Sequence, residues 1–534
     1  MRSDLRAPPA DLEAARRLLA DCCLRAPSAA RLLDRLASGE SPGVSGVFGS
    51  ASAVLLAAAR ERLRKPILLV TPGPREAEEA AGDLATVAGG SILLFPAWET
   101  LPGEGIEPHP DLVGDRFRAL AALAAARPAG APPIVVAPAR AIAQRVPLPA
   151  AFAAEILCIR RGGSVSIEEL VRRLEGGGYR RVEMVEWKGE YCVRGGIVDV
   201  FPPDAEEPVR LELWGDEAAT IRSFHAGTQR ASGELDAVAL TPASEKALLE
   251  RRAAARGTIL DYLPASALVA LQEPAAVDKA FDGLQGTAGA FLSPEETRAA
   301  LDARQALRLA LLPADGLEMT LSPDFRSLEP YRALALGPET GGGWGGRIFT
   351  QLAEWAAAGA RICLFCNAAG ERQRLEELLR ERGIVLPPES VVALGSLRAG
   401  FFSPAGRLAV VTDGELFARY RVRRFRRRFK GTAQITGFAA FRAGDRVVHA
   451  GHGIGIYRGV ARLPKDGVER DFLVLEYAEK AKLYVPIDQA GLVERYVGVG
   501  KGAPLLDRLG GSRWKSARVA AQRAIFDYAA EILQ

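Results

Sequence analysis

Hydrophobic residues recur at helical spacing near the start of the chain and then gather into short continuous runs. Between Asp11 and Leu36, leucines lie at helical spacing among Arg and Asp, and Pro27 interrupts the pattern, which predicts two amphipathic helices. Short apolar runs then alternate with further helical patterns, and such alternation predicts a parallel α/β sheet. These runs lie at 66–72, 91–95 and 133–137.

Farther along the chain, polar and apolar residues alternate one by one in segments separated by Gly and Pro turns. This period of two is typical of strands and predicts a mixed or antiparallel β-rich insert. The alternating segments are 179–185, 195–201 and 209–214. Helical and α/β patterns return at 244–312, and a second α/β segment is expected at 325–418, with strands at 360–365 and 408–412.

The last group of predicted strands contains regularly spaced glycines. Short twisted strands with regular glycines, here Gly451, Gly453 and Gly455, indicate a small β-barrel. The expected strands are 445–449, 454–461, 471–477 and 482–487. The final stretch, 514–534, places apolar residues on one helical face and contains no terminating Gly, Asn or Pro, so the printed sequence is expected to stop inside a helix.

Length and composition fit a multidomain globular protein. The chain has 534 residues, of which 48% are hydrophobic and 25% charged, which argues against disorder and against a small disulfide-stapled fold. Its 69 basic and 65 acidic residues give a net charge of +4, too little for a protein that coats nucleic acid, so any such contact should be local. No charge-free apolar stretch is long enough to cross a bilayer, and the six cysteines show no framework spacing, so we expect a cytoplasmic protein.

Two pairs of Cys or His residues could suggest a metal site, but their surroundings argue against metal binding. Cys363 and Cys366 lie in an apolar run without a second pair or a nearby His, which favours a buried strand over zinc or redox chemistry. His449 and His452 lack a third ligand, which favours strand packing. We therefore expect no metal site.

A Gly-rich loop precedes a predicted helix, where a phosphate-binding loop would lie. Such a loop needs backbone N–H groups around the phosphates, a Lys on the β/γ-phosphates and a Ser or Thr on magnesium. Aligned on Gly49 and Ser50, the Lys position holds Ser52 and the metal-ligand position holds Ala53, with Gly46 at the start of the loop. The loop is therefore expected to be non-functional for nucleotide, and no catalytic residue is assigned.

A dense basic segment joins the second α/β segment to the glycine-punctuated strands. Its arginines are interleaved with aromatic residues, a combination suited to phosphate contact. The candidate DNA contacts are Arg423, Arg424, Arg426, Arg427 and Arg428. A solvated or internally paired interdomain linker is the alternative interpretation.

The motifs together resemble one bacterial protein family. Residues 46–53, 69–72, 94–102 and 116–120 resemble the first domain of the excision-repair helicase UvrB, in the degenerate form found in transcription-repair coupling factors. The other matches extend over most of the remaining chain: 189–202 and 210–217 resemble the inserted domain that both families share, and 444–457 with 481–487 resembles the CarD-like RNA-polymerase-interacting domain.

The resemblance implies two protein partners. In the family the inserted domain docks UvrA, and the matching polar positions here are Arg180, Arg194 and Arg210. Arg suits such an interface because its planar guanidinium binds carboxylates with two hydrogen bonds. For Arg210, a simple pairing across a strand is the alternative.

The second partner that the resemblance implies is the β subunit of RNA polymerase, bound through an exposed strand of the CarD-like domain. Strand addition uses backbone groups and needs little side-chain specificity. The matching segment is Val447, Val448, His449, Ala450, Gly451, His452, Gly453, Ile454 and Gly455. Family members often carry a larger apolar residue where this chain has Ala450.

The expected fold class is multidomain α/β and α+β: a degenerate RecA/UvrB-like parallel α/β domain with a mixed β-rich insert, a second small α/β domain, and a small Tudor/SH3-like β-barrel. The expected segments are N-terminal helices at 1–39; the first part of the UvrB-like domain at 40–140; the inserted UvrA-binding domain at 141–230; the second part of the UvrB-like domain at 231–320; a species-variable α/β domain at 325–418; a basic linker at 419–436; the CarD-like domain at 437–505; and the start of a linker helix toward a motor at 506–534.

The resemblance thus implies the non-motor half of a transcription-repair coupling factor, an adaptor between stalled RNA polymerase and UvrA. ATP and magnesium belong to the family's motor half, whose motifs are absent from these residues, so no cofactor is expected here and DNA contact falls mainly to the motor. We expect either a fragment or a motorless variant, with no membrane partner. Two alternatives stay open: an active UvrB-type helicase, and a CarD-like transcription regulator with a passive UvrB-like platform.

Overall fold

The computed structural model describes most of the chain. The described residues are 10–98, 108–125, 131–251, 255–284, 291–314, 316–322, 324–331, 346–417, 444–449, 453–465, 468–486, 493–495 and 506. They fall into two compact units, Met1–Phe425 and Arg426–Gln534, and each is considered by itself.

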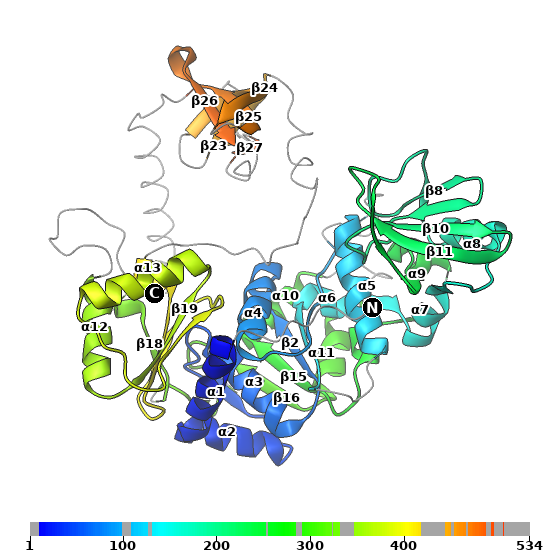
Figure 1. The fold of residues 1–534 in the computed structure, drawn as a ribbon. Coiled ribbons are helices and arrows are strands. Elements are labelled where there is room, and N and C mark those ends of the chain that lie inside the picture. The colour runs from blue at the N-terminus through cyan, green and yellow to red at the C-terminus, as the bar shows by residue number, and fades with distance from the viewer. Residues whose placement is uncertain are drawn as a thin grey trace. The chain divides into compact units, whose positions relative to one another are not determined.

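Two helices open the first unit, as the leucine spacing predicts (Figure 1). They are α1 (Ala10–Arg25) and α2 (Pro27–Ala37), and Pro27 stands in the first turn of α2, where its missing N–H has no helical partner to lose. The apolar face of α1, including Leu19 and Cys23, is buried in a core that continues into both α/β sheets of this unit.

A seven-stranded parallel sheet forms the centre of this unit, which confirms the predicted α/β domain. Its strand order is β17-β1-β16-β15-β2-β4-β3. The strands are β1 (Gly43–Ser45), β2 (Ile67–Thr71), β3 (Ile92–Leu94), β4 (Ile134–Pro138), β15 (Leu268–Gln272), β16 (Ala306–Leu309) and β17 (Met319–Thr320). The associated helices are α3 (Ala51–Leu63), α4 (Pro74–Val87), α5 (Pro110–Ala124), α6 (Ala139–Ala143), α10 (Pro274–Asp282) and α11 (Pro294–Asp302).

Helices cover both faces of this sheet, which is why its central strands are continuously apolar. Along β2, Leu69 packs into the core shared with α3 and α4, whereas Leu68 and Val70 pack into the core shared with α5, α6 and α10. Every residue of β2 and β4 is buried. A strand with two buried faces has no polar side to alternate with.

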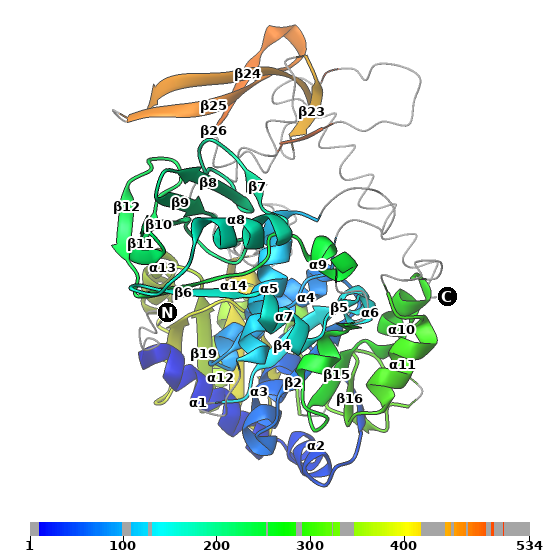
Figure 2. The same ribbon diagram turned by 90° about the vertical axis from the view of Figure 1, so that its right-hand side faces the viewer.

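The β-rich insert leaves this domain after β4 and returns before β15 (Figure 2). Its six-stranded sheet has the order β12-β11-β10-β9-β8-β7. The strands are β7 (Arg180–Arg181), β8 (Glu190–Arg194), β9 (Ile197–Val200), β10 (Val209–Trp214), β11 (Glu217–Phe224) and β12 (Ala231–Glu234). One face packs on α8 (Ile167–Gly176), and the alternating residues of β10 place the polar side chains on the other face.

Short elements connect the insert to the parallel sheet. They are β5 (Val146–Pro147), α7 (Pro149–Glu155), β6 (Leu157–Arg160), β13 (Ala237–Leu240), α9 (Glu245–Arg251), β14 (Arg256–Gly257) and the 3-10 helix η1 (Ile259–Tyr262). The entering strand β6 pairs antiparallel with the leaving strand β13, with Leu157 opposite Leu240. The insert is therefore attached through two adjacent paired strands.

The second α/β domain has a mixed five-stranded sheet of order β18-β21-β22-β19-β20. Its elements are β18 (Arg326–Ser327), η2 (Glu329–Tyr331), α12 (Gly346–Ala357), β19 (Arg361–Cys366), α13 (Ala369–Glu381), β20 (Val391–Leu394), β21 (Phe401–Ser403), β22 (Leu408–Thr412) and α14 (Asp413–Phe417). One sheet face, with Phe365 and Val410, shares its core with α1 and α3, and the other packs on α12 and α13. The first face is thus completed by helices from the other domain.

The prediction that Cys363 and Cys366 lie in a buried strand is confirmed, since both belong to β19 and are buried. Burial raises the pKa of the Cys366 thiol to about 12. A thiol held in its neutral form is a poor metal ligand and a poor nucleophile. The described residues contain no cluster of three groups suited to a metal ion.

The second unit contains a five-stranded antiparallel sheet of order β26-β25-β24-β23-β27. The elements are β23 (Arg446–His449), β24 (Gly453–Lys465), β25 (Val468–Glu476), η3 (Ala478–Lys480), β26 (Lys482–Pro486) and β27 (Val493–Arg495). A closed barrel was expected, but among the described strands β26 and β27 are the two outer strands and do not pair with each other.

One ion pair is completely buried at the junction between the parallel domain and the insert. The guanidinium of Arg116 on α5 donates from Nε to Glu245 Oε2 over 2.7 Å and from Nη2 to Oε1 over 2.9 Å, and both side chains have 0% exposure. Trp98 Nε1 also donates to Glu245, and Arg116 Nη1 donates to the carbonyl of Pro96. The Arg116 guanidinium also lies 4.2 Å from the ring centroid of Phe95.

We expect Glu245→Ala to destabilise this junction by about 3–5 kcal/mol, because it leaves a buried guanidinium without its counter-charge. Hydrogen exchange of the α5 and α9 amides in the full chain measures the opening free energy locally. The matched control is the double variant Arg116→Met/Glu245→Leu, which removes both charges and should lose less than the single variant. Equal protection in Glu245→Ala and the parent would contradict the assignment.

Candidate functional site

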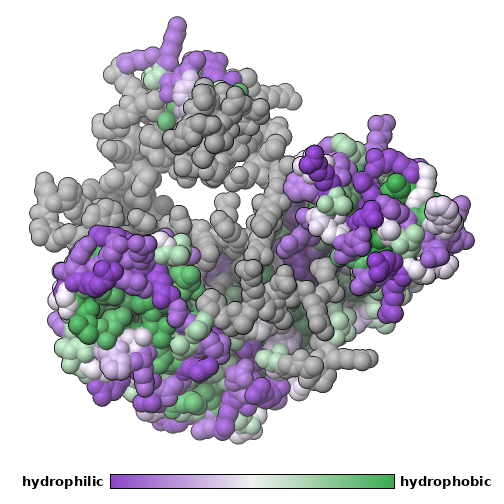
Figure 3. All heavy atoms as spheres, viewed as in Figure 1, coloured by the Kyte–Doolittle hydropathy of each residue, from purple (hydrophilic) through white to green (hydrophobic). Residues whose placement is uncertain are grey.

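The polar face of the insert carries the three predicted arginines on β7, β8 and β10. In the register, Asp199 of β9 stands opposite both Cys192 of β8 and Arg210 of β10, so these residues share one face. Arg194 lies two positions beyond Cys192 and projects from the same side. In the space-filling view, hydrophilic side chains cover most of the insert's surface that faces the viewer (Figure 3).

Asp199 joins two of the predicted residues. This carboxylate is 1% exposed and accepts from Arg210 Nε at 2.7 Å, from Arg210 Nη2 at 2.9 Å and from Arg194 Nη2 at 2.6 Å. Two guanidinium groups around one carboxylate leave one positive charge uncompensated within this cluster, a suitable feature for an acidic partner surface.

The two arginines differ in how far they are available to a partner. The Arg210 side chain is 23% exposed and lies over the ring of Phe224, and its hydrogen bond to Asp199 raises its pKa. The structure therefore shows the cross-strand pairing that was the alternative interpretation of Arg210. The Arg194 side chain is 51% exposed, so it presents more of its guanidinium to solvent.

Arg180 lies apart from this pair and is held by a different carboxylate. Its Nη2 donates to Glu190 Oε1 at 2.5 Å, while Glu190 Oε2 accepts the backbone N–H groups of Glu186 and Trp187. Glu190 is buried, but the Arg180 side chain is 73% exposed. All three predicted arginines are thus positioned by buried acids, and only Arg194 and Arg210 share one.

The structure adds an aromatic residue that the motif comparison did not single out. Trp214 is 86% exposed at the end of β10, on the same polar side as Arg210 and Glu212. A tryptophan with this much exposed surface is costly to leave in water and is a common anchor of protein interfaces. The alternation of 209–214 already places it on the polar face, so the sequence contained the signal.

The Gly-rich loop before α3 is occupied by protein rather than open to a ligand. Residues 396–400 of the second α/β domain, here called the plug, lie directly on it. The backbone N–H of Ser50 donates to Ala399 O at 3.0 Å, Arg398 Nη2 donates to Gly49 O at 2.8 Å, and Ala399 N donates to Ser50 Oγ at 3.4 Å. At the start of α3, these contacts use the N–H and hydroxyl groups of Ser50 and the carbonyl group of Gly49.

Close approach of the plug to Gly49 leaves no space for a phosphate group at that point. A Cβ built on Gly49 would lie 2.8 Å from Gly400 O and 2.9 Å from Ala399 O, and the positive φ of 56° at Gly49 also favours glycine. Ser52 stands where a phosphate-binding loop has its Lys, and the plug occupies the space beside Gly49.

Asp83 of α4 helps to hold the plug and carries a perturbed carboxyl group. It is 3% exposed and accepts the backbone N–H of Arg398 at 2.7 Å. Burial raises its pKa to about 6, although the Arg398 guanidinium and the Ser50 hydroxyl act in the opposite direction. Ionisation of Asp83 at neutral pH therefore lowers the free energy of unfolding.

The prediction that the strand from Val447 is an exposed edge is wrong for its described part. β23 pairs with β24 on one side and with β27 on the other, with Val447 opposite both Gly455 and Arg495. Backbone groups already used by two neighbours cannot accept a further strand. The interior position of β23 depends on β27, for which no strand was predicted.

Several predicted positions lie outside the described residues. They are Ala450, Gly451 and His452, and the arginines Arg423, Arg424, Arg426, Arg427 and Arg428. No helix in the described part is long and apolar enough to cross a membrane.

Comparison with known proteins matches two segments to family models. Residues 157–245 match the UvrB interaction domain, and residues 441–497 match the CarD-like/TRCF RID domain. The first match covers the polar face with Arg194, Arg210 and Trp214, and the second covers the five-stranded sheet. The chain is thus a multidomain protein that combines these two modules.

The curated relatives that match most of the chain carry one description. The chain is 30% identical over 96% of its length to "Transcription-repair-coupling factor" of Mycobacterium tuberculosis, 28% identical over 92% to that of Bacillus subtilis and 26% identical over 93% to that of Escherichia coli. It spans about half the length of these relatives, 49%, 48% and 48% respectively. The chain belongs to the transcription-repair-coupling factor family.

We expect Asp83→Asn to remove part of the pH dependence of stability. The folded-state pKa is raised from 3.8 to about 6, so in the parent protein stability falls as pH rises through this interval and stays lower above it. The unfolding free energy of the variant minus that of the parent should therefore increase by about 1–3 kcal/mol from about pH 4 to pH 8. Urea unfolding at both pH values measures this difference. Parallel stability profiles would contradict this, and the exposed Asp34→Asn is the matched control.

Proposed function

We propose that this chain acts as an adaptor in transcription-coupled DNA repair, linking RNA polymerase stalled at a lesion to UvrA. The observation that carries the proposal is the presence, in one chain, of a UvrB interaction domain with a cationic and aromatic face and of a CarD-like/TRCF RID domain. Each module accounts for one partner, and a chain that binds both brings the repair protein to the polymerase.

The UvrA contact is assigned to the polar face of the insert. Arg194 supplies a half-exposed charge, and Trp214 supplies exposed apolar area. Asp199 fixes the guanidinium of Arg210, which lies between these two residues in the sequence. Fixing the guanidinium groups before binding reduces the conformational entropy lost at the interface. An acidic partner surface matches this arrangement.

The RNA polymerase contact, with the β subunit as the proposed partner, is assigned to residues 450–455, the part of the predicted segment that follows β23. Because Val447–His449 already has neighbours on both sides, the contact surface is narrowed to the three residues between His449 and Gly453 and to the start of β24. The outer strand β26, where Tyr484 is 43% exposed, could also accept an added strand. Docking of the β subunit on β26 is therefore the alternative to this assignment.

The chain's own residues are proposed to be non-catalytic. A UvrB-type helicase needs a nucleotide at the loop before α3, and there Ser52 replaces the lysine and the plug covers Gly49. ATP and magnesium are proposed only for the motor part of family members, and DNA contact through the basic segment at 423–428 is a secondary proposal.

A CarD-like transcription regulator is the second candidate function, favoured only by the match at 441–497. The two candidates differ in the role of the insert. A regulator holds polymerase without UvrA, whereas an adaptor holds both. A pull-down in which the full chain retains polymerase but not UvrA would favour the regulator.

We expect Arg194→Glu to weaken UvrA binding about tenfold or more, because it reverses an exposed interface charge beside Asp199. Trp214→Ala should have an effect of similar size through lost apolar contact. Titration calorimetry at matched salt measures both. Arg172→Glu on α8, behind the opposite face of the sheet, introduces the same charge change and should bind normally. Parent-like affinity in both test variants would move the interface elsewhere.

We expect Ala450→Arg to reduce binding to the polymerase β subunit about tenfold or more, because a bulky charge would enter the proposed contact. Tyr484→Arg on β26 serves as the matched variant at the competing edge and should leave binding unchanged. A two-component binding assay with the isolated β subunit compares them. The reverse result, with loss only in Tyr484→Arg, would assign docking to β26.

A further inference from the structure

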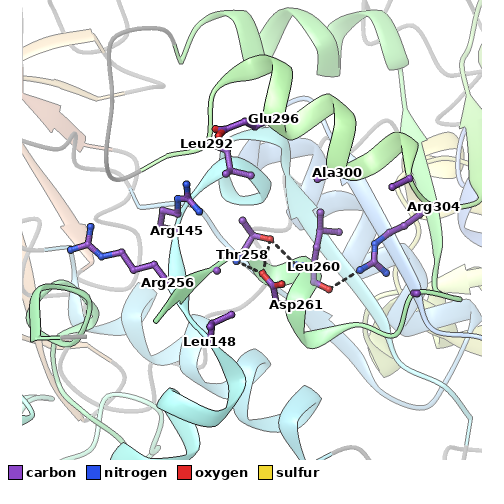
Figure 4. Close-up of a pocket in the computed structure, with 13 residues that line it drawn as sticks. Arg145, Leu148, Arg256, Thr258, Leu260, Asp261, Leu292, Glu296, Ala300 and Arg304 are labelled. Atoms are coloured by element: carbon purple, nitrogen blue, oxygen red, sulfur yellow. Dashed lines mark hydrogen bonds between the residues drawn. The ribbon is translucent and has the colours of Figure 1, made fainter. Parts of the chain in front are cut away.

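A cavity in the parallel domain is lined by none of the residues assigned to the two proposed docking surfaces. It is formed by the loop before α7, by the segment from β14 through η1, and by α11, all in the first unit (Figure 4). Its volume is about 520 Å³, within the range of small-molecule sites. Apolar walls come from Leu148, Leu260, Leu292 and Ala300.

The charges lining this cavity do not balance. Three arginines, Arg145, Arg256 and Arg304, are half-buried, whereas the two lining carboxylates, Asp261 and Glu296, are exposed. Exposed carboxylates are screened by solvent, so they offset the half-buried positive charges only weakly.

Both carboxylates are also held by their own backbone. Asp261 Oδ2 accepts the N–H of Thr258 at 2.7 Å, and Glu296 Oε2 accepts the N–H of Ser293 at 2.8 Å. These capping boxes begin η1 and α11. Among the described residues neither acid forms an ion pair with a lining arginine, although Asp261 acts electrostatically on Arg304.

The arginines in turn are held by neutral groups or by none among the described residues. Arg304 donates to the carbonyls of Leu260 and Pro264, and Arg256 donates to the carbonyl of Leu249. Carbonyl partners position a guanidinium without cancelling its charge, and burial lowers the pKa of Arg304. The described part of the chain supplies no hydrogen bond or ion pair for Arg145.

The close-up shows how the groups lie. Arg145 and Arg304 approach from opposite sides of Thr258 and Asp261, with the Arg304 guanidinium joined to the Leu260 carbonyl, while the end of Arg256 extends away from this centre (Figure 4). The cavity therefore combines apolar walls with cations at its two sides, a combination that fits an anion with an organic body.

We propose that this cavity binds a small phosphate-bearing organic anion of about mononucleotide size, with Arg145 as the principal phosphate ligand. Guanidinium groups bind phosphate through paired, charge-assisted hydrogen bonds, and Arg145 has its donors available for this. Leu148, Leu260 and Leu292 contact the organic part. The site is separate from the plugged loop before α3.

Titration calorimetry of the full chain with AMP, with inorganic phosphate and with adenosine tests the proposal. AMP and phosphate should bind and adenosine should not, and Arg145→Glu should weaken AMP binding about tenfold or more. Arg145→Gln removes the charge but keeps a polar side chain, so it tests whether weaker binding by Arg145→Glu comes from a folding defect. Arg17→Glu, an exposed position on α1 with the same charge change, should bind AMP as the parent does.

Hydrogen exchange locates the bound anion. AMP should slow exchange of the amides around Thr258 and η1. Binding of AMP that Arg145→Glu and Arg145→Gln leave unchanged would overturn the proposal, as would protection confined to the loop at 46–53 or the absence of any binding at millimolar ligand.

Discussion

The buried pair of Arg116 and Glu245 is the constraint on which the arrangement of the first unit depends. Glu245 stands at the point where the chain returns from the insert, and Arg116 belongs to a helix of the parallel domain, so two chemically opposite charges join segments far apart in sequence. Neither charge is tolerable alone in that environment. The aromatic rings of Phe95 and Trp98 exclude water from the pair and lie within cation–π distance of its guanidinium. The insert's exit is thereby specified by charge as well as by packing.

A second long-range contact changes the meaning of the degenerate nucleotide loop. The first N–H groups of a helix have no partner within the helix and need hydrogen-bond acceptors from elsewhere. Here Ala399 O of the plug, more than three hundred residues later in the sequence, accepts the N–H of Ser50, and Asp83 on the neighbouring helix accepts the N–H of Arg398. The two α/β domains share one core through Leu19, Phe365 and Val410. The loop before α3 thus forms part of the internal interface between the two α/β domains.

Local periodicity predicted much of the fold, because helix and strand patterns depend on neighbouring residues. The two opening helices, the strands at 209–214 and 408–412 and the buried Cys363 strand agree with the structure. Sequence patterns did not show which acid holds each arginine: Asp199 and Glu190 are ordinary strand residues until pairing brings them opposite Arg210 and Arg180. The same limit explains the error at β23, because being an edge is a property of the whole sheet and not of the strand. The plug and the charged cavity depend on tertiary contacts in the same way.

The pairing of β6 with β13 has a consequence for the history and engineering of this fold. Since Leu157 and Leu240 are cross-strand neighbours, the insert's two ends lie about 5 Å apart at the backbone, as in a hairpin. A module with adjacent ends can be gained, exchanged or removed at a single point of its host, because closing the gap needs only a tight turn. The parallel sheet would keep its strand order in each case. The geometry thus makes the insert a unit that could be exchanged between host domains.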